Sequence, residues 1–287
     1  APPRPAATLQ EESMIFPPSA LTVLTDPRTE IRDDRVRIPF ELDRPVYEQV
    51  DKALKEMGGR WDGRTAVRAH VFAYRIEEFM RQCLAAGEYP SKNEQGWYAT
   101  PPALVTHLVD AAGIFAGHTV LEPSAGAGAL TSEIAKRGGL VDAYEVDERR
   151  ADILRAQGDC RRVFAADFLA QDPMEYAEGF DRIVMNPPFA NGLDHILHAL
   201  QFMKDDGHLV SVMSQGLMWW SDRKSTEFRE LVEEVGGDIE HLPDDSFAVS
   251  GTNVRTCLVF VPGYAGSRLR THDWLLRQPR QLDLFAA

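Results

Sequence analysis

A glycine-rich turn between a predicted strand and a predicted helix is the feature that most constrains the fold of this chain. Residues 118–121 predict a short buried strand, residues 129–137 predict a helix, and the turn between them reads Glu122-Pro123-Ser124-Ala125-Gly126-Ala127-Gly128. Glycines at such a turn let backbone N–H groups approach a ligand closely. Thr131 stands where a dinucleotide fingerprint needs Gly or Ala. The turn therefore predicts an α/β fold with a ligand at the strand end, and argues against NAD or FAD.

A second motif, Asn186-Pro187-Pro188-Phe189, follows the predicted strand 180–185. Asn186 supplies a side-chain carbonyl acceptor. Pro187 has no N–H group and restricts the residue before it to extended geometry. Phe189 adds an aromatic face beside these fixed acceptors. The motif therefore predicts a site for a planar substrate that carries an NH2 group.

In this order and spacing, the two motifs resemble those of class I S-adenosyl-L-methionine-dependent methyltransferases that act on amino groups, over about residues 93–263. The similarity is greatest to DNA adenine-N6 enzymes whose cofactor motif precedes the catalytic motif, including the solitary enzymes of bacteria, phages and plasmids. The resemblance implies a doubly wound, mostly parallel, Rossmann-like α/β sheet of seven strands, with cofactor and substrate at the carboxyl ends of the strands. It also implies methyl transfer to adenine N6 in DNA after base flipping.

Other substrates remain open, because similar Asn-Pro-Pro motifs occur in methyltransferases that act on cytosine N4, on RNA bases and on protein glutamine. All of these substrates present a planar NH2 group. A non-enzymatic protein that senses the cofactor or binds DNA is a further alternative, and the intact motif argues against it. Little chain follows Val261 that would form a large target-recognition domain.

The resemblance also assigns site residues. Catalysis falls to Asn186, Pro187, Pro188 and Phe189. Contacts with S-adenosyl-L-methionine are implied for Tyr98, Thr100, Glu122, Pro123, Ser124, Ala125, Gly126, Gly128, Glu145, Val146, Asp167, Phe168 and Asn186.

Some of these positions have plain structural alternatives. Glu145 follows Gly126 by 19 residues, an offset suited to an acid that binds ribose hydroxyls, while Asp147 suits the cap of the next helix better. Thr100 is a good N-cap with Pro101 at the first helical position. Asp167 is assigned to the cofactor's adenine amine and Phe168 to its ring, and the alternative is a loop aspartate with a core phenylalanine.

Four segments organise the chain. Residues 1–28, rich in proline and threonine, predict a disordered tail, and residues 29–92 predict a small α+β accessory unit. That unit has a helix at 43–57, a hairpin around Asp62-Gly63 and a helix at 75–86. Residues 93–263 form the predicted catalytic domain and 264–287 a tail. Arginines in the accessory unit suit either a solvated face or DNA-backbone contact: Arg60, Arg64, Arg68, Arg75 and Arg81.

The loop that follows the predicted strand 208–214 contains two adjacent tryptophans. A helix at 193–204 precedes that strand, and strands at 239–242 and 254–261 are expected to form an antiparallel edge pair. The tryptophans are either core residues or a base-stacking element, and the second role is favoured. Substrate contacts are therefore predicted for Trp219, Trp220, Arg223 and Lys224.

Composition limits the partners and the compartment. The net charge of −13 predicts weak, salt-sensitive non-specific affinity for DNA, although a local basic face can still bind it. Three scattered cysteines without a Cys-x-x-Cys motif argue against a disulfide framework or a metal site. No apolar run is long enough for a membrane span, so a cytoplasmic enzyme is expected.

The sequence Gln281-Leu282-Asp283-Leu284-Phe285 near the C-terminus resembles the short motif by which bacterial proteins bind the replication sliding clamp. Leu284 and Phe285 are suited to fill a partner's pocket. The alternative is a tail that docks on its own domain. The recognition sequence, the strand preference and the oligomeric state do not follow from the sequence.

Overall fold

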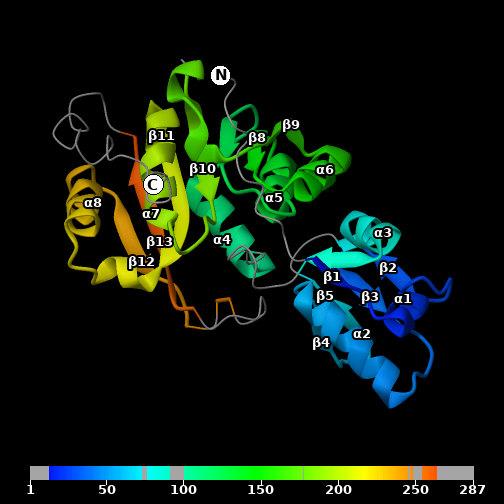
Figure 1. Ribbon diagram of the computed structural model, residues 1–287. Coiled ribbons are helices and arrows are strands. Elements are labelled where there is room, and N and C mark those ends of the chain that lie inside the picture. The colour runs from blue at the N-terminus through cyan, green and yellow to red at the C-terminus, as the bar shows by residue number, and fades with distance from the viewer. Residues whose placement is uncertain are drawn as a thin grey trace, which may run out of the picture. The chain divides into compact units, whose positions relative to one another are not determined.

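The computed structural model describes residues 13–72, 76–90, 100–176, 178–244, 246–247 and 254–263 (Figure 1). The chain divides into two compact units. The first contains residues 1–72 and 76–97, and the second contains residues 73–75 and 98–287. Among the described residues, no helix combines the length and the apolar character needed to cross a bilayer.

The N-terminal unit is a small α+β structure. Its elements are β1 (Ser13–Ile15), α1 (Pro18–Leu24), β2 (Glu30–Arg32), β3 (Arg35–Arg37), α2 (Arg44–Glu56), β4 (Arg60–Asp62), β5 (Ala69–Val71), α3 (Ile76–Ala86) and β6 (Glu88–Pro90). Antiparallel strands in the order β2-β3-β5-β4 form one sheet, and β1 pairs with β6. The predicted hairpin is present, with Trp61 opposite His70.

The predicted disordered tail is wrong for residues 13–24. Helix α1 packs on α2 and buries Ala20 and Leu24. Phe16 is also buried, and its ring lies 4.6 Å from that of Tyr89. This segment becomes ordered because its few apolar residues bury against distant parts of the unit.

The second unit is a doubly wound α/β structure. Its helices and strands are α4 (Pro102–Ala112), β7 (Thr119–Glu122), α5 (Ala129–Lys136), β8 (Leu140–Glu145), α6 (Glu148–Gln157), β9 (Cys160–Ala165), β10 (Phe180–Met185), α7 (Gly192–Ala199), β11 (Met203–Ser214), α8 (Arg223–Glu234), β12 (Asp238–His241) and β13 (Thr256–Pro262). The described residues form a seven-stranded sheet in the order β12-β13-β11-β10-β7-β8-β9. The predicted fold class is confirmed.

The sheet is mostly parallel, and the predicted antiparallel edge pair is present as β12 and β13. Strand β13 lies between β11 and β12 and runs antiparallel to both. Strands β12 and β9 are therefore the two edges of the sheet.

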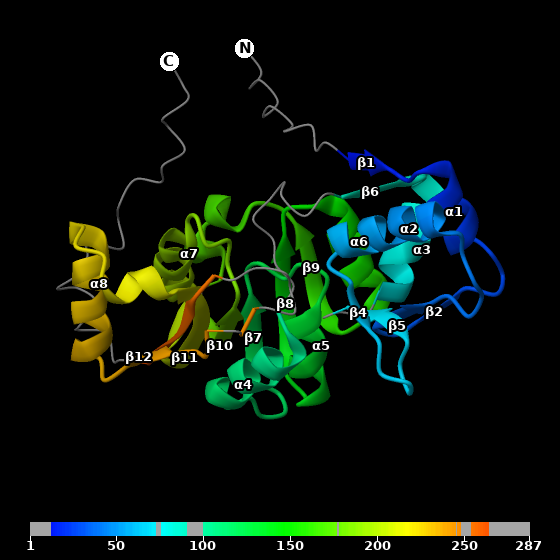
Figure 2. The same ribbon diagram turned by 90° about the horizontal axis from the view of Figure 1, so that it is seen from below.

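Alternate residues along the central strands bury two cores, one on each face of the sheet. Leu121, Ile183 and Leu209 belong to the cluster that includes residues of α7 and α8. Their neighbours Val120, Val184 and Val210 belong to the cluster that includes residues of α4 and α5. Figure 2 shows α7 and α4 on opposite sides of the strands. Because strand side chains alternate between faces, the nearly continuous apolar runs in this sequence serve both layers.

The region after α7 corrects the predicted boundaries. The expected helix over 193–204 ends at Ala199, a 3-10 turn (Leu200–Phe202) follows, and β11 begins at Met203 rather than at residue 208. The turn keeps Leu200 and Phe202 buried, so the apolar stripe continues past the helix. The start of β11 lacks the apolar pattern of a buried strand because its residues are mostly polar, so the sequence did not predict it.

Asp181 ties three strands together at the amino ends of β7 and β10. Its carboxylate accepts hydrogen bonds from the Thr119 N–H and hydroxyl groups, both at 2.8 Å, and from the Lys204 ammonium at 2.7 Å. Burial opposes ionisation of Asp181, but these donors lower its pKa to about 2. The opposite ends of these strands, where both motifs occur, are left to form the site.

Candidate active site

The carboxyl ends of β8, β7 and β10 meet at the centre of the sheet. Leu121 of β7 is opposite Ile183 of β10, and Glu122 is opposite Ala143 of β8. After β7 the chain builds β8 and β9 on one side and β10 on the other, so the strand order reverses between β7 and β10. Ligands of open α/β sheets bind at such a switch point. The glycine turn and the Asn-Pro-Pro-Phe motif lie on its two sides.

Two glycines in left-handed conformation form the turn after β7. The φ angles of Gly126 and Gly128 are 55° and 89°. A Cβ atom on Gly128 would also lie 2.9 Å from Leu154 Cδ2 and closer still to Gln157. Both the backbone conformation and the available space therefore require glycine at position 128.

Glu145, at the end of β8, lies directly on this turn. Its carboxylate accepts from Gly126 N at 2.7 Å, from Asp147 N at 2.9 Å and from the buried Arg150 guanidinium at 2.8 Å. Asp147 in turn accepts from Arg150 N at the start of α6, so its predicted capping role is confirmed. Glu145 is thereby held at the turn by backbone and side-chain donors.

Two further polar groups lie buried beside the turn. Oε2 of Glu122 and Oγ of Ser124 have no hydrogen-bond partner among the described residues. Burial and the nearby Glu145 carboxylate raise the pKa of Glu122 well above its usual range. Because buried polar atoms are normally paired, these two atoms indicate a site built to receive a polar ligand.

Asn186 is connected to the start of the catalytic domain. Its Nδ2 donates to Thr100 Oγ1 at 3.1 Å. This corrects the predicted capping role of Thr100, because Pro101 occupies the N-cap of α4 and Pro102 the first helical position. Since nitrogen and oxygen lie on opposite sides of a planar carboxamide, the bond directs the Asn186 oxygen away from Thr100.

The end of the motif contacts an aromatic residue that the sequence analysis missed. The ring of Phe189 meets that of the buried Phe247 edge to face, with centroids 5.6 Å apart. No local pattern marked Phe247, which lies beyond β12 in a turn. Phe189 is only partly buried.

The family model described as "Methyltransferase small domain" matches residues 100–245. The chain belongs to this family. It is accordingly a class I S-adenosyl-L-methionine-dependent methyltransferase, and S-adenosyl-L-methionine is its methyl donor.

Two curated relatives match parts of this methyltransferase. One is "Ribosomal RNA small subunit methyltransferase A" of Geobacillus thermodenitrificans, 38% identical over 95 residues, which are 30% of this chain and 32% of the relative. The other is "rRNA adenine N-6-methyltransferase" of Aeromicrobium erythreum, 37% identical over 82 residues, which are 26% of this chain and 24% of the relative. The matched segments thus span a third or less of the relatives' length.

A solved structure supports the fold. A chain described under "Structural basis underlying complex assembly and conformational transition of the type I R-M system" aligns with a TM-score of 0.52 and 19% identity. The alignment covers 66% of this methyltransferase and 46% of the solved chain.

The residues at the switch point fit the donor of this family. The glycine turn leaves room for close approach of a ligand. Glu145 supplies carboxylate oxygens. Oε2 of Glu122 and Oγ of Ser124 are buried and have no hydrogen-bond partner among the described residues, so a polar ligand could pair with them. Val146, beside Glu145, is 65% exposed and offers an apolar surface. The individual contacts with the donor remain predictions, and Tyr98 lies outside the described residues.

The predicted cofactor pair after strand β9 has structural roles within the described residues. Asp167 caps a 3-10 turn (Phe168–Ala170) by accepting from Leu169 N at 2.9 Å. Phe168 is 2% exposed and packs on Tyr144 and Phe202 in the core. A side chain buried this deeply does not line an open ligand site. The structure therefore favours the core role for Phe168 over contact with the cofactor ring.

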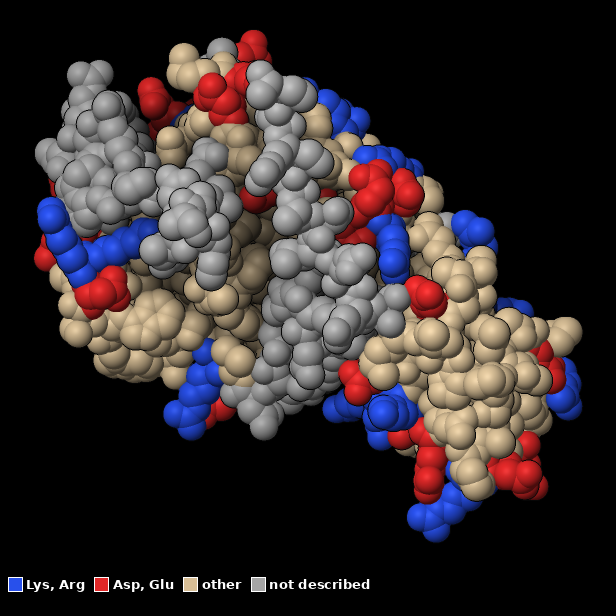
Figure 3. Space-filling view, in the orientation of Figure 1, with Lys and Arg blue, Asp and Glu red and all other residues tan. Residues whose placement is uncertain are grey.

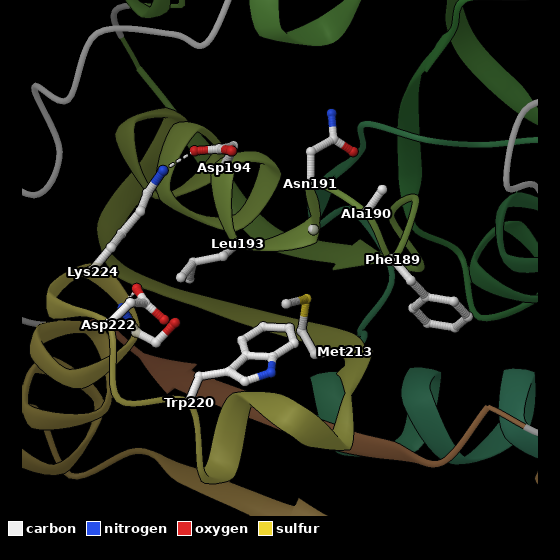
Figure 4. Close-up of a pocket in the computed structure, with 11 residues that line it drawn as sticks. Phe189, Ala190, Asn191, Leu193, Asp194, Met213, Trp220, Asp222 and Lys224 are labelled. Atoms are coloured by element: carbon white, nitrogen blue, oxygen red, sulfur yellow. Dashed lines mark hydrogen bonds and ion pairs between the residues drawn. The ribbon is translucent and has the colours of Figure 1, made fainter.

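The tryptophan loop of the methyltransferase is exposed, which argues against the core alternative. Trp219 and Trp220 are 60% and 40% exposed. Trp220 and Lys224 line a cavity of about 540 Å³ that begins at Phe189 (Figure 4). Trp219 instead lies against His241, with ring centroids 5.4 Å apart, and Arg223 pairs with Glu227 at 2.7 Å. The structure thus brings two of the four predicted substrate residues to one cavity.

Charges of both signs are mixed on the face that Figure 3 shows. In Figure 3, Lys and Arg side chains are interspersed with Asp and Glu. In the N-terminal unit, Arg60, Arg64, Arg68 and Arg81 are exposed, and Arg64 bonds to Asp62. Arg75 and the motif from Gln281 to Phe285 lie outside the described residues.

Proposed function

We propose that this methyltransferase transfers a methyl group to the exocyclic N6 amine of adenine in DNA. One observation carries the proposal: the Asn186 amide is oriented by Thr100 at the carboxyl end of β10, across the switch point from the glycine turn. An oriented acceptor followed by proline suits an NH2 group on a flat ring.

The chemical difficulty is the weak nucleophilicity of the amine, whose lone pair is delocalised into the adenine ring. The Asn186 side-chain carbonyl and the Pro187 main-chain carbonyl would accept its two hydrogens. These acceptors favour a pyramidal nitrogen and stabilise the positive charge that develops on it. S-adenosyl-L-methionine supplies a methyl group on a positively charged sulfur: the new C–N bond would form as the C–S bond breaks, S-adenosyl-L-homocysteine would leave, and the nitrogen would release one proton to solvent. Alignment of the amine with that group provides much of the rate.

The substrate base has to leave its stack to reach this site. Phe189 would pack on the extruded ring, and Phe247 supports Phe189 from the side. Extrusion costs a few kcal/mol in a duplex and less in a single strand. Single-stranded or locally opened DNA is therefore the most favourable substrate form.

Ribosomal RNA adenine is the second candidate substrate. The matched curated relatives are named as rRNA methyltransferases, one of them as an adenine N-6 enzyme. They match this chain over only 95 and 82 residues, so the similarity does not extend to most of either relative. Adenine N6 presents the same NH2 group in RNA and in DNA.

Methyl transfer from labelled S-adenosyl-L-methionine to DNA, rRNA and protein, followed by nucleoside and amino-acid analysis, tests the proposal. Labelled N6-methyladenine in DNA supports it. Label in rRNA adenine alone selects the second candidate. Label on cytosine or on glutamine contradicts both.

Thr100 is expected to position Asn186. Thr100→Val removes the acceptor but keeps the shape, and we expect kcat to fall about tenfold, the effect of one lost hydrogen bond. Thr100→Ser keeps the hydroxyl and is expected to retain most activity. Calorimetric titration with S-adenosyl-L-methionine provides the second measurement. An unchanged kcat with weaker donor binding in Thr100→Val would instead assign Thr100 to the cofactor alone.

The tail motif adds a separate proposal about a partner. A peptide spanning residues 280–287 is expected to bind a bacterial sliding clamp at about micromolar Kd, through Leu284 and Phe285. Such a tether would offset the weak attraction to DNA expected at a net charge of −13. Fluorescence anisotropy of the labelled peptide measures this, with the double alanine variant at these two positions as the control. Equal binding of both peptides, or of neither, contradicts it.

A further inference from the structure

The cavity beside Phe189 is lined neither by the glycine turn nor by Glu145, the residues expected to hold the methyl donor. It is formed by the segment after the Asn-Pro-Pro-Phe motif, by the start of α7, by β11 and by the residues that lead into α8. Figure 4 shows Phe189 at one end and the ion pair of Asp194 with Lys224 at the other. The volume of about 540 Å³ is within the range of small-ligand sites.

One wall of the cavity is the indole of Trp220, and the fold holds it in place. A Cβ atom on Gly216 would lie 2.6 Å from Trp220 Nε1, so the indole packs directly on the Gly216 backbone. The Arg229 guanidinium donates to the carbonyl oxygens of Leu217 and Trp220, both at 2.8 Å. The 40% exposed ring is therefore a preformed flat surface rather than a loose side chain.

The polar groups of the cavity suit a ligand whose edge both donates and accepts hydrogen bonds. The Asp194 carboxylate accepts and the Lys224 ammonium donates, and each side chain is about 30% exposed. Asn191, which also lines the cavity, offers both functions on one amide. A flat apolar wall facing mixed donors and acceptors matches a nucleobase, which has a π-face for stacking and a polar edge for hydrogen bonds.

We infer that this cavity binds the base of a nucleotide next to the one that is methylated, stacked on Trp220 and recognised along its edge by Asp194, Lys224 and Asn191. Phe189 lines one end of the cavity, so the segment that carries the Asn-Pro-Pro-Phe motif also borders it, and the nucleotide next to the methylated one would lie within its reach. The inference rests on the proposed nucleic-acid substrate. It would make these residues determinants of sequence context.

A coupling experiment tests this inference. The wild-type enzyme and the Trp220→Ala variant are assayed on a single-stranded oligonucleotide whose methylated position has been located. The same assay is repeated with an abasic site at each nearby position in turn. We expect Trp220→Ala to lower kcat/KM about 10- to 100-fold, the usual effect of losing one stacked base. At one adjacent position, an abasic site should lower kcat/KM of the wild type by a similar factor. The same abasic site should hardly change kcat/KM of Trp220→Ala.

Two further variants keep the result interpretable. Trp220→Phe preserves a stacking face and should retain most activity, which separates stacking from folding defects. Trp219→Ala removes a neighbouring tryptophan that does not line the cavity. Its effect on kcat/KM should be independent of every abasic site, so that the two losses of free energy add. The inference would be overturned if the effect of Trp220→Ala were independent of the abasic site at every position tested. Failure of the wild type to methylate any oligonucleotide would instead contradict the proposed function.

Discussion

Methyl transfer is expected to fall about 100- to 1000-fold when Asn186 is replaced by alanine, the range found when one preorganised polar group is removed from an active site. The substitution removes the side-chain acceptor for the substrate amine and leaves the Pro187 carbonyl alone. It also removes the hydrogen bond to Thr100. Single-turnover measurement with saturating donor and substrate isolates the chemical step.

Binding and stability provide the controls for this variant. Asn186 follows β10 and is only partly buried, so its side chain contributes little to the core. The melting temperature is therefore expected to change little. Because Asn186 is also a predicted contact of S-adenosyl-L-methionine, donor affinity is measured separately by titration, and saturating donor keeps the chemical step comparable. Turnover within threefold of the wild type would exclude the proposed role of Asn186 in catalysis.

Binding of S-adenosyl-L-methionine is expected to weaken about 10- to 100-fold in Glu145→Gln, because hydrogen bonds to a charged acceptor are stronger than those to a neutral one. Glutamine is the appropriate replacement. Alanine would remove the carboxylate that pairs with the buried Arg150 at 2.8 Å, would leave the longer Asp147 pair at 3.4 Å, and would destabilise the fold as well. Titration calorimetry gives the affinity directly.

An exposed glutamate close in sequence serves as the matched control. Glu148 begins α6, and its side chain is 69% exposed and pairs with Arg155. Glu148→Gln is expected to leave donor affinity unchanged. The wild-type melting temperature should rise with added donor, and the rise should be smaller in Glu145→Gln. Equal affinity in the wild type and Glu145→Gln would remove Glu145 from the predicted ribose contact.

The sequence allowed the central elements of the fold to be predicted because their burial patterns are local. Strand β10 has the predicted bounds, and α2 differs from its prediction by one residue at each end. Patterns failed where order depends on distant partners. Helix α1 is short and begins at a proline, and Phe16 beside it packs on Tyr89. The first part of β11 reads Met-Lys-Asp-Asp, which is mostly polar. It is nevertheless a strand, because Met203 pairs with Phe180 of β10.

The same distinction explains the outcome at the site. The positions of the glycine turn, Glu145 and Asn186 follow from strand ends that the pattern locates. Their partners do not, because Thr100 is 86 residues from Asn186 and no local signal links the two. Phe168 is a position at which its burial and the family resemblance indicate different roles. The family resemblance gave it a ligand role, whereas the aromatic residues around it make it part of the core.

The two edge strands have a consequence for self-association. Exposed strand edges can pair with another chain and seed aggregation. On β9, Arg161 and Arg162 both pair with Asp142 and remain 39% and 49% exposed. On β12, Asp238 and Glu240 are exposed. A strand added at either edge would strip water from these charges. These charges therefore oppose edge-to-edge pairing of two copies at high concentration.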